Sequence, residues 1–531
     1  MLRSCLIIII SITINPVFAS QNTSIASSIR PIAMLLSAVT GDETSVNILL
    51  PGNMSPHDYR LKFSDIKLLE KDTIEVGAAI LDRKVSDFAQ NNNISSMEFL
   101  SCIPGSIGGA IIMNSGCYGS DISQILLSIK KHIDSDRLVS KKTNADYQKE
   151  FRDIGIKLGG NLSIEEWEEL FRKITFWELE LEKSGDDSMK QILEMQKSEA
   201  NAQFFKFIKS NYESWFSGSQ DSPLMSHQIF KHSVLPELNE DKTTFFIVID
   251  NLRYDQWKMI QPSLMNDFRI EDESLYFSIL PTATQYSRNA IFSGLLPLQM
   301  EQQHKDWWKN DTDEGGKNLF EKEFLEAQIK RLGKGHLKVS YNKITNIDAG
   351  RRLVDNMRNL MNNQLNVIVY NFVDMLSHAR TDMKVIKELA EGNAAYRSLT
   401  TSWFEYSPLK DMFAFIANNN SKVVVTTDHG TVLVKKPTKV LGEKDLTTNL
   451  RYKLGRNMKY NSKEVFEINH PKDVFLPVVN MSSKYIFARE DCFFAYPNNY
   501  NYYVNHYKET FQHGGVSLEE MIIPIVTLSS K

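Results

Sequence analysis

Apolar residues recur at helical spacing through the middle of the chain. They fall every three or four positions over residues 122–133, 164–181 and 188–216. The second of these stripes opens with a capping box, Ser163 with Glu166, which is typical of a helix start. Long amphipathic helices in direct succession predict an α-helical bundle.

A different pattern follows the polar segment at 217–223, where we place a domain boundary. Continuous apolar runs at 243–250, 365–374 and 421–428 are typical of buried parallel strands. Polar and helix-like stretches separate these runs. Residues 224–531 therefore predict an α/β domain with a mostly parallel sheet and flanking helices.

Residues 1–121 show neither the helical nor the strand pattern. The predicted bundle therefore begins at residue 122, and we place its end at residue 217, where the polar segment begins. Residues 1–19 combine Arg3 with an apolar run and small residues, which are features of a secretory signal segment. That run is too short to span a bilayer, and no later stretch is apolar enough to do so. We expect residues 20–121 to form an incomplete, poorly packed α/β region.

The composition excludes some function classes. A chain of 531 residues should contain more than one domain, and 42% hydrophobic with 24% charged residues is ordinary for a globular protein. The net charge of −4 provides neither a basic field for duplex nucleic acid nor a polybasic membrane patch. A small anionic substrate would need local positive charge, such as a metal ion. The scattered cysteines, Cys5, Cys102, Cys117 and Cys492, predict free thiols.

Each predicted strand of the α/β domain ends in an aspartate. These residues are Asp250, Asp374 and Asp428. Ligands bind beyond the carboxyl ends of strands in open α/β sheets, so the three carboxylates could share one site. The alternative is that each aspartate only caps the helix that follows it.

Histidines accompany these carboxylates. His378 lies four residues after Asp374, His429 directly follows Asp428, and His513 precedes two glycines that let the backbone come close to a ligand. Carboxylate and imidazole groups together are the ligand set of zinc and related divalent metals. The pattern therefore indicates a metal site.

A hydroxyl stands where it could act as a nucleophile. Thr282 and Thr284 precede a helix-like segment, and Arg288 follows one turn later. A helix N-terminus stabilises anions, but threonine is a weak nucleophile that would need a metal to hold it as an alkoxide. The spacing leaves open whether Thr284 attacks phosphorus or only caps the helix.

Short motifs along the second half resemble a known family. They are "VIDN" at 248–251, "PTAT" at 281–284, "DMLSH" at 374–378, "TTDHG" at 426–430 and "QHGG" at 512–515. In order and spacing they resemble the phosphodiesterase branch of the alkaline phosphatase superfamily. The similarity is greatest to PglZ-domain proteins, and among these to PorX-like response regulators linked to type IX secretion.

The resemblance implies a nucleophile and two zinc sites. The nucleophile would be Thr284. One metal would take its ligands from Asp374, His378 and His513. The other would take them from Asp250, Asp428 and His429.

Contacts to substrate phosphate are less well defined. Related phosphodiesterases carry an asparagine about twenty residues after the nucleophile, and Asn310 is the candidate here. Arg288, Lys436 and Arg451 are further candidates, with surface salt bridges as the alternative for each. The tyrosines between residues 496 and 507 could stack nucleic-acid bases, with packing as the alternative.

The N-terminal part resembles two other families in fragments. Residues 20–71 are similar to a zinc-uptake substrate-binding protein, and His57 matches one of its zinc ligands. Residues 72–121, with "IPGSIGGA" at 103–110, are similar to UDP-N-acetylenolpyruvoylglucosamine reductase, a flavoenzyme. Both fragments lack the rest of their sites, so we expect neither a zinc site at His57 nor bound FAD. The chain looks chimeric.

These observations favour a zinc-dependent phosphodiesterase or phosphatase, acting on nucleotides or oligonucleotides, in a two-component signalling context. One alternative is a non-catalytic, metal-stabilised signalling protein. Another is a periplasmic zinc binder or flavoprotein. We expect a homodimer through residues 122–217 and, by resemblance, secretion-system or sigma-factor partners. The resemblance implies a cytoplasmic protein, whereas the signal-like segment favours the periplasm, and the sequence leaves this open.

Overall fold

The computed structural model describes most of the chain after residue 80. The described residues are 24–27, 45–48, 66–70, 73–76, 80–107, 110–111, 114–125, 135–184, 187–218, 221–239, 242–374, 376, 392–442, 447–478, 480, 482–497 and 499–531. The signal-like segment and the candidate ligands His57 and His378 lie outside them. No helix in these ranges has both the length and the apolar composition that crossing a bilayer requires. The chain divides into two compact units, Met1–His132 and Ile133–Lys531.

The first unit is built from short elements. They are β1 (Ser24–Ser27), β2 (Ser45–Ile48), β3 (Ile66–Glu70), β4 (Thr73–Val76), α3 (Asp82–Asn91), η1 (Glu98–Cys102), β5 (Gly116–Cys117), β6 (Ser120–Asp121) and η2 (Ile122–Gln124). Val85, Phe99, Leu100 and Ile107 belong to one buried apolar cluster. Residues 80–122 are therefore better packed than we expected. Cys102, Cys117 and Cys492 carry free thiols.

The second unit begins with the predicted helical bundle. Its elements are α5 (Ser135–Leu158), α6 (Ile164–Ser184), α7 (Asp187–Asn211) and η3 (Tyr212–Phe216). The predicted capping box is present, because the backbone N–H of Ser163 donates to Glu166 (2.8 Å) and that of Glu166 donates to the Ser163 hydroxyl (3.3 Å). The predicted stripe of α6 is buried, including Trp167, Phe171 and Ile174. Of the expected helix over 122–133 the structure describes only residues 122–125, which hold a short helical turn at Ile122–Gln124.

A six-stranded sheet forms the centre of this unit. Its order is β8 (Phe268–Phe277), β19 (Ile522–Ser530), β11 (Lys422–Thr426), β7 (Thr244–Ile249), β10 (Leu365–Tyr370) and β9 (Val339–Ile344). The last four strands in this order are mutually parallel, whereas β19 runs antiparallel to both of its neighbours. The predicted α/β class with a mostly parallel sheet is confirmed. Because the three predicted strands, β11, β7 and β10, are neighbours, their carboxyl ends meet at one edge.

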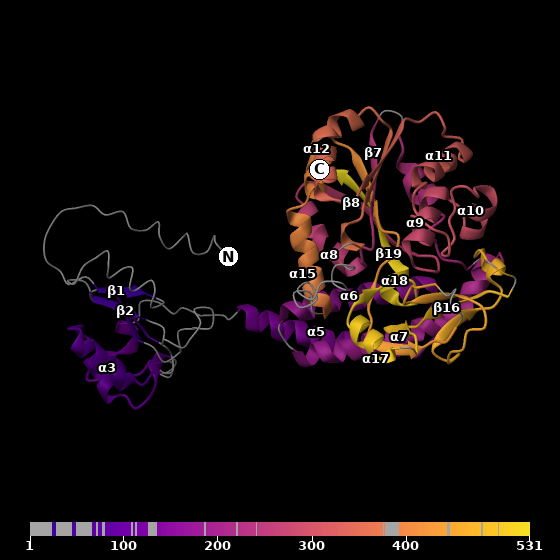
Figure 1. Ribbon diagram of the computed structural model, residues 1–531. Helices are drawn as coiled ribbons and strands as arrows, with labels where there is room; N and C mark the ends of the chain where they lie inside the picture. Colours follow the sequence, from indigo (N-terminus) through magenta and orange to yellow (C-terminus); the bar gives the residue numbers. More distant parts are fainter. Residues whose placement is uncertain are drawn as a thin grey trace. The chain divides into compact units, whose positions relative to one another are not determined.

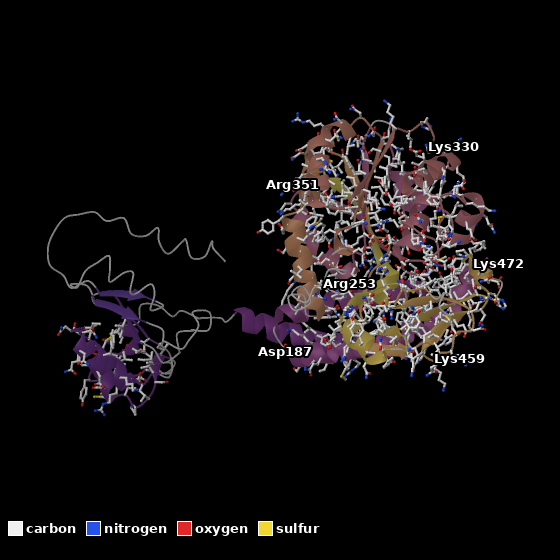
Figure 2. The ribbon with its side chains drawn as sticks, viewed as in Figure 1. Asp187, Arg253, Lys330, Arg351, Lys459 and Lys472 are labelled. Atoms are coloured by element: carbon white, nitrogen blue, oxygen red, sulfur yellow. The ribbon has the colours of Figure 1, made fainter. Side chains whose placement is uncertain are left out.

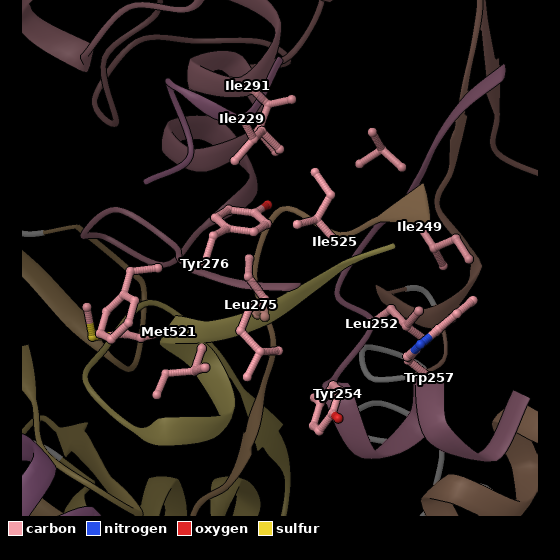
Figure 3. Close-up of a cluster of buried hydrophobic side chains, with 14 of the residues drawn as sticks. Ile229, Ile249, Leu252, Tyr254, Trp257, Leu275, Tyr276, Ile291, Met521 and Ile525 are labelled. Carbon is pink, nitrogen blue, oxygen red and sulfur yellow. The ribbon is translucent and has the colours of Figure 1, made fainter. Parts of the chain in front are cut away.

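Helices cover both faces of the sheet (Figure 1). One face carries α9 (Thr284–Ser293), α10 (Pro297–Gln303) and α11 (Glu321–Arg331), and the other carries α8 (Tyr254–Leu264), α12 (Ile347–Leu360), α15 (Gly392–Glu405) and α16 (Pro408–Asn418). Strand β7 is buried along its whole length. Figure 3 shows part of this core, in which Leu252, just past β7, lies beside Trp257 of α8.

Smaller strands lie between β11 and β19 along the chain. They are β12 (Val432–Leu433), β13 (Lys436–Lys439), β14 (Tyr452–Gly455), β15 (Val465–Ile468), β16 (Lys484–Ala488), β17 (Cys492–Ala495) and β18 (Phe511–Gln512), with helices α17 (Tyr500–Tyr507) and α18 (Leu518–Met521). Short helical turns occupy Phe230–Val234, Leu235–Glu237 and Pro471–Val474. Antiparallel pairing of β12 with β18 sets Val432 opposite Gln512. This pairing brings the loop after His429 to the loop that holds His513.

Candidate active site

Two strand ends bring three of the predicted metal ligands together. Asp250 directly follows β7, and Asp428 and His429 follow β11. All three side chains are buried. One potential ligand atom from each lies within 4.8 Å of those of the other two. We call this group the Asp250 cluster.

Thr284 faces the Asp250 cluster. Its Oγ1 lies 3.1 Å from Nε2 of His429 and 3.4 Å from Oδ1 of Asp250. Thr284 is the first residue of α9, and the N-cap position belongs to Ala283, whose extended backbone (φ −141°, ψ 144°) starts the helix. The Thr284 hydroxyl is therefore directed at the cluster, and helix capping does not explain its place.

The remaining predicted ligands lie beside this cluster. Nε2 of His513 is 3.8 Å from Oδ1 of Asp374. Asn251 donates from Nδ2 to the same carboxylate oxygen at 3.4 Å. The imidazole rings of His429 and His513 stack with centroids 4.2 Å apart. His378, the third predicted ligand of this second group, lies outside the described residues.

Backbone carbonyls determine which nitrogen of each histidine carries the hydrogen. Nδ1 of His429 is 3.0 Å from the carbonyl oxygen of Gly430, and Nδ1 of His513 is 3.2 Å from that of Thr282. A carbonyl oxygen can only accept, so Nδ1 carries the hydrogen in both rings. Nε2 then carries the lone pair that can bind a metal, an arrangement typical of metal-ligating histidines.

Arg288 is a buried counter-ion of the cluster. Its Nη1 is 2.7 Å from Oδ2 of Asp250 and 3.7 Å from Oδ2 of Asp428, and its Nε is 2.5 Å from Glu321. Burial alone would raise the pKa of Asp250, but Arg288 and His429 outweigh that effect and lower it. Burial also lowers the pKa of His429, which keeps its imidazole neutral at pH 7. Of the two alternatives that the sequence left open for Arg288, a phosphate contact and a surface salt bridge, the structure shows ion pairs, but buried ones that include two metal-ligand candidates.

The cluster has the donors that a divalent metal needs. Oδ2 of Asp428 is buried and accepts no hydrogen bond from the part of the chain that the structure describes. An unbonded, buried carboxylate oxygen is costly unless a cation compensates it. Two carboxylates and one neutral imidazole with a free Nε2 fit zinc. Asp250, Asp428 and His429 could hold one ion, and Asp374 and His513 lie where they could hold a second.

Two other expected substrate contacts, Asn310 and Lys436, bond to nearby side chains. Nδ2 of Asn310 donates to Glu301 at 3.1 Å, and its Oδ1 accepts from Trp308 at 3.0 Å. Lys436 is exposed and pairs with Asp491 at 3.1 Å, as the salt-bridge alternative predicted.

Arg451 is paired with a buried carboxylate. It is fully buried and binds Glu520 through Nε (3.1 Å) and Nη2 (2.5 Å). The same carboxylate accepts the backbone N–H of Gly515 at 2.9 Å, two residues after His513. These contacts favour a positioning role over contact with phosphate.

Sequence reasoning missed Asn318. Its Nδ2 donates to the backbone carbonyl of Thr284 and to Oδ1 of Asn289, each at 3.1 Å. The residues between 301 and 320 contain more than one asparagine, and only the course of the loop decides which of them reaches the start of α9.

Some tyrosines of α17 pack against the protein interior, and others are exposed to solvent. Tyr500 and Tyr507 pack against a small buried cluster that includes Phe493, whereas Tyr502 is 65% exposed. Packing therefore explains part of this aromatic segment.

Models of known protein families match the larger part of the chain. The family described as "BREX system PglZ alkaline phosphatase-like domain" matches residues 229–528, which is more than half of the chain. The chain belongs to the PglZ family. Ahead of the PglZ domain, the family described as "PorX response regulator linker domain" matches residues 137–216, which are the helical bundle. A family described as "FAD binding domain" matches residues 60–133, a wider range than the predicted fragment at 72–121.

Curated relatives of this PglZ protein match short stretches. UDP-N-acetylenolpyruvoylglucosamine reductase of Pelagibacter ubique is 52% identical over 68 residues, covering 13% of this chain and 22% of the relative. The enzyme of Wolbachia pipientis wMel is 46% identical over 69 residues, covering 13% and 23%. The chain thus spans about a fifth of the length of these relatives. The combination of this fragment with a PglZ domain is consistent with a chimeric chain, as predicted.

Solved structures similar to the PglZ protein include phosphoesterases and a phosphonate hydrolase. Murine ectonucleotide pyrophosphatase/phosphodiesterase 5 aligns with a TM-score of 0.36 at 11% identity over 54% of this chain and 88% of that one. Phosphonoacetate hydrolase from Sinorhizobium meliloti, in complex with phosphonoformate, aligns with a TM-score of 0.37 at 11% identity, covering 54% and 90%.

Proposed function

We propose that this chain is a zinc-dependent phosphodiesterase or phosphatase in which Thr284 is the nucleophile. Its membership of an alkaline phosphatase-like family supports phosphoester hydrolysis. The observation that carries the proposal is the position of the Thr284 hydroxyl, within 3.4 Å of Asp250 and 3.1 Å of His429. Helix capping does not require that position, whereas nucleophilic attack does.

The residues around Thr284 have separable roles in this proposal. Bound zinc would supply the positive charge that stabilises the attacking and leaving oxygens of an in-line displacement. Thr284, held as an alkoxide with the help of the metal, would form a bond from Oγ1 to phosphorus, and the leaving alcohol would take the electrons of the broken P–O bond and a proton from water. A water molecule would then displace Thr284 from phosphorus and release the phosphate product. Asn318 holds the backbone carbonyl of Thr284 at 3.1 Å. We assign it the positioning of the nucleophile.

The substrate and the cellular context are also proposals. We propose nucleotides or oligonucleotides as substrates, and a PorX-like signalling context linked to type IX secretion because the bundle matches a PorX linker. Dimerisation through this bundle and a cytoplasmic site of action belong to the same proposal. We propose no flavin function for the N-terminal match, because a stretch of that length cannot enclose FAD.

Hydrolysis of bis-p-nitrophenyl phosphate by the full chain, with and without zinc, tests the proposal. Thr284→Ala should lower zinc-dependent turnover by about three orders of magnitude. Thr312→Ala, which changes an exposed threonine on a loop, is the matched control and should turn over like the wild type. If the wild type binds zinc but turns over neither this diester nor nucleotide diesters, the alternative of a metal-stabilised signalling protein is favoured.

A further inference from the structure

A short helix connects the bundle to the two histidine loops. Helix α18 contacts α7 on one side. Nζ of Lys197 is 3.0 Å from Oε1 of Glu519, and Nδ2 of Asn201 donates to Oε2 of the same carboxylate at 3.1 Å. The backbone N–H of Leu518 donates to Oδ1 of Asn201 at 2.8 Å. Two side chains of α7, one turn apart, therefore hold α18 by its backbone and by its carboxylate.

The other side of α18 touches the site. The N–H of Gly430, the residue after His429, donates to the carbonyl oxygen of Glu520 at 3.2 Å. A Cβ on Gly430 would lie 1.9 Å from the carbonyl oxygen of Glu519, so only glycine permits this approach. Any shift of α18 is therefore transmitted to the backbone beside His429.

Lys197 of α7 forms ion pairs with both α6 and α18. Its side chain is 14% exposed and lies 2.8 Å from Glu178 of α6 as well as 3.0 Å from Glu519. Burial alone would lower the pKa of Lys197, but the two carboxylates outweigh burial and raise it. The lysine therefore stays cationic and neutralises acidic groups from both the bundle and α18.

We propose that Lys197 and Asn201 are positioning residues of the PglZ site. By holding Glu519 they fix α18, and α18 in turn holds Gly430 and the free Nε2 of His429 toward Thr284. The helical bundle is then part of the apparatus that shapes the site, in addition to being a linker. That Lys197 and Asn201 matter for catalysis rests on the proposed function. That they hold α18 and the backbone at Gly430 does not depend on it.

Hydrogen–deuterium exchange of the full chain tests the positioning without metal or substrate. Exchange in the peptide that contains the Gly430 amide reports how firmly α18 holds it. In Lys197→Met and in Asn201→Ala, exchange of this peptide should be about tenfold faster than in the wild type. Lys197→Arg, which keeps the charge, should restore slow exchange.

Two controls separate positioning from general loss of stability. Lys190→Met removes an exposed ion pair with Asp187 on the same helix. Tyr147→Phe removes a buried hydrogen bond to Gln196 inside the bundle. Neither control should change exchange at Gly430. If Lys197→Met does not fold, Asn201→Ala and Lys197→Arg still provide the comparison.

Zinc affinity, measured by competition with a chromophoric chelator, is the second readout. Lys197→Met should weaken zinc binding by about three- to tenfold, less than loss of a residue that contacts the ligands directly. Unchanged Gly430 exchange in folded Lys197→Met and Asn201→Ala would overturn the inference even if the wild type is active. Faster exchange in a protein that hydrolyses no ester would support the inference and count against the proposed function.

Discussion

Oγ1 of Thr284 lies 3.1 Å from Nε2 of His429, although the two residues are 145 positions apart in the chain. The sheet brings them together, because β11 delivers His429 and the loop after the edge strand β8 delivers Thr284. The hydrogen bond of Nδ1 to Gly430 leaves Nε2 free to face the hydroxyl. A hydroxyl and an unprotonated ring nitrogen are thus held together before any ligand arrives.

The hydroxyl of Thr284 should matter more than its shape. Thr284→Ser keeps an oxygen beside Asp250 and His429 and should retain zinc-dependent turnover within about a hundredfold of the wild type. Thr284→Val keeps the branched shape but removes the oxygen, and it should be as inactive as the alanine variant. Steady-state hydrolysis of a diester measures both. Equal activity of the serine and valine variants would show that this oxygen does not attack phosphorus.

Removing Arg288 should destabilise the metal-free protein strongly. The change to methionine leaves Asp250 buried without its guanidinium partner and leaves Glu321 with Lys343 as its remaining cation. Breaking a buried ion pair typically costs about 3–5 kcal/mol. Bound zinc supplies a replacement cation beside Asp250, so the melting temperature of Arg288→Met should recover in part when zinc is added.

Arg351→Met is the control for this variant, because Arg351 is 72% exposed and pairs only loosely with Asp348 at 3.9 Å. Differential scanning fluorimetry with chelator or with zinc measures both proteins. A melting temperature of Arg288→Met that stays near wild type in chelator would contradict the role of counter-ion.

Arg451 should behave as a positioning residue. Arg451→Met leaves the buried carboxylate of Glu520 without its cation, and this carboxylate anchors the loop that holds Gly515 and His513. We expect lower kcat, weaker zinc binding and a lower melting temperature together. The double variant with Glu520→Gln should recover part of the stability, because no charge is then left alone. A raised KM with unchanged zinc affinity and stability would instead indicate that Arg451 contacts the substrate.

The centre of the sheet could be predicted from the sequence because burial on both faces makes strand runs continuously apolar. The runs that became β7, β10 and β11 were identified in this way, and their aspartates do meet at one edge. The strands β8 and β19 were not predicted. The first alternates apolar residues with Arg269, Glu271 and Glu273, and the second contains Pro524, so neither presents a continuous apolar run.

Residues that act through long-range contacts could not be assigned from local patterns. Arg288 and Arg451 each carry a charge that a phosphate could use, and only the fold places buried carboxylates against them. Asn310 and Asn318 are equivalent in sequence terms, since both lie in one polar loop. The contact of Asn318 with Thr284 depends on how that loop folds back onto α9.

Lys453 should make stability depend on pH in a characteristic direction. It is buried, and its Nζ donates to the carbonyl of Thr447 at 2.5 Å and lies 4.8 Å from the ring centroid of Tyr496. No carboxylate among the residues that the structure describes forms an ion pair with it. Burial lowers the pKa of Lys453 from 10.5 to about 7.

The folded protein therefore binds this proton less tightly than the unfolded chain does. The cost of burying Lys453 is present in full below about pH 7 and is relieved as the pH rises toward 10.5. Lys453→Met removes that cost, so its stabilising effect should be greatest at pH 6 and should fall by about 1.4 kcal/mol per pH unit between pH 7 and pH 10. Lys459→Met, which changes an exposed lysine on the surface seen in Figure 2, should show no such trend. Melting temperatures of the wild type and the two variants from pH 6 to pH 10 provide the measurement. A difference in stability between Lys453→Met and the wild type that does not change with pH would mean that Lys453 is charged throughout this range.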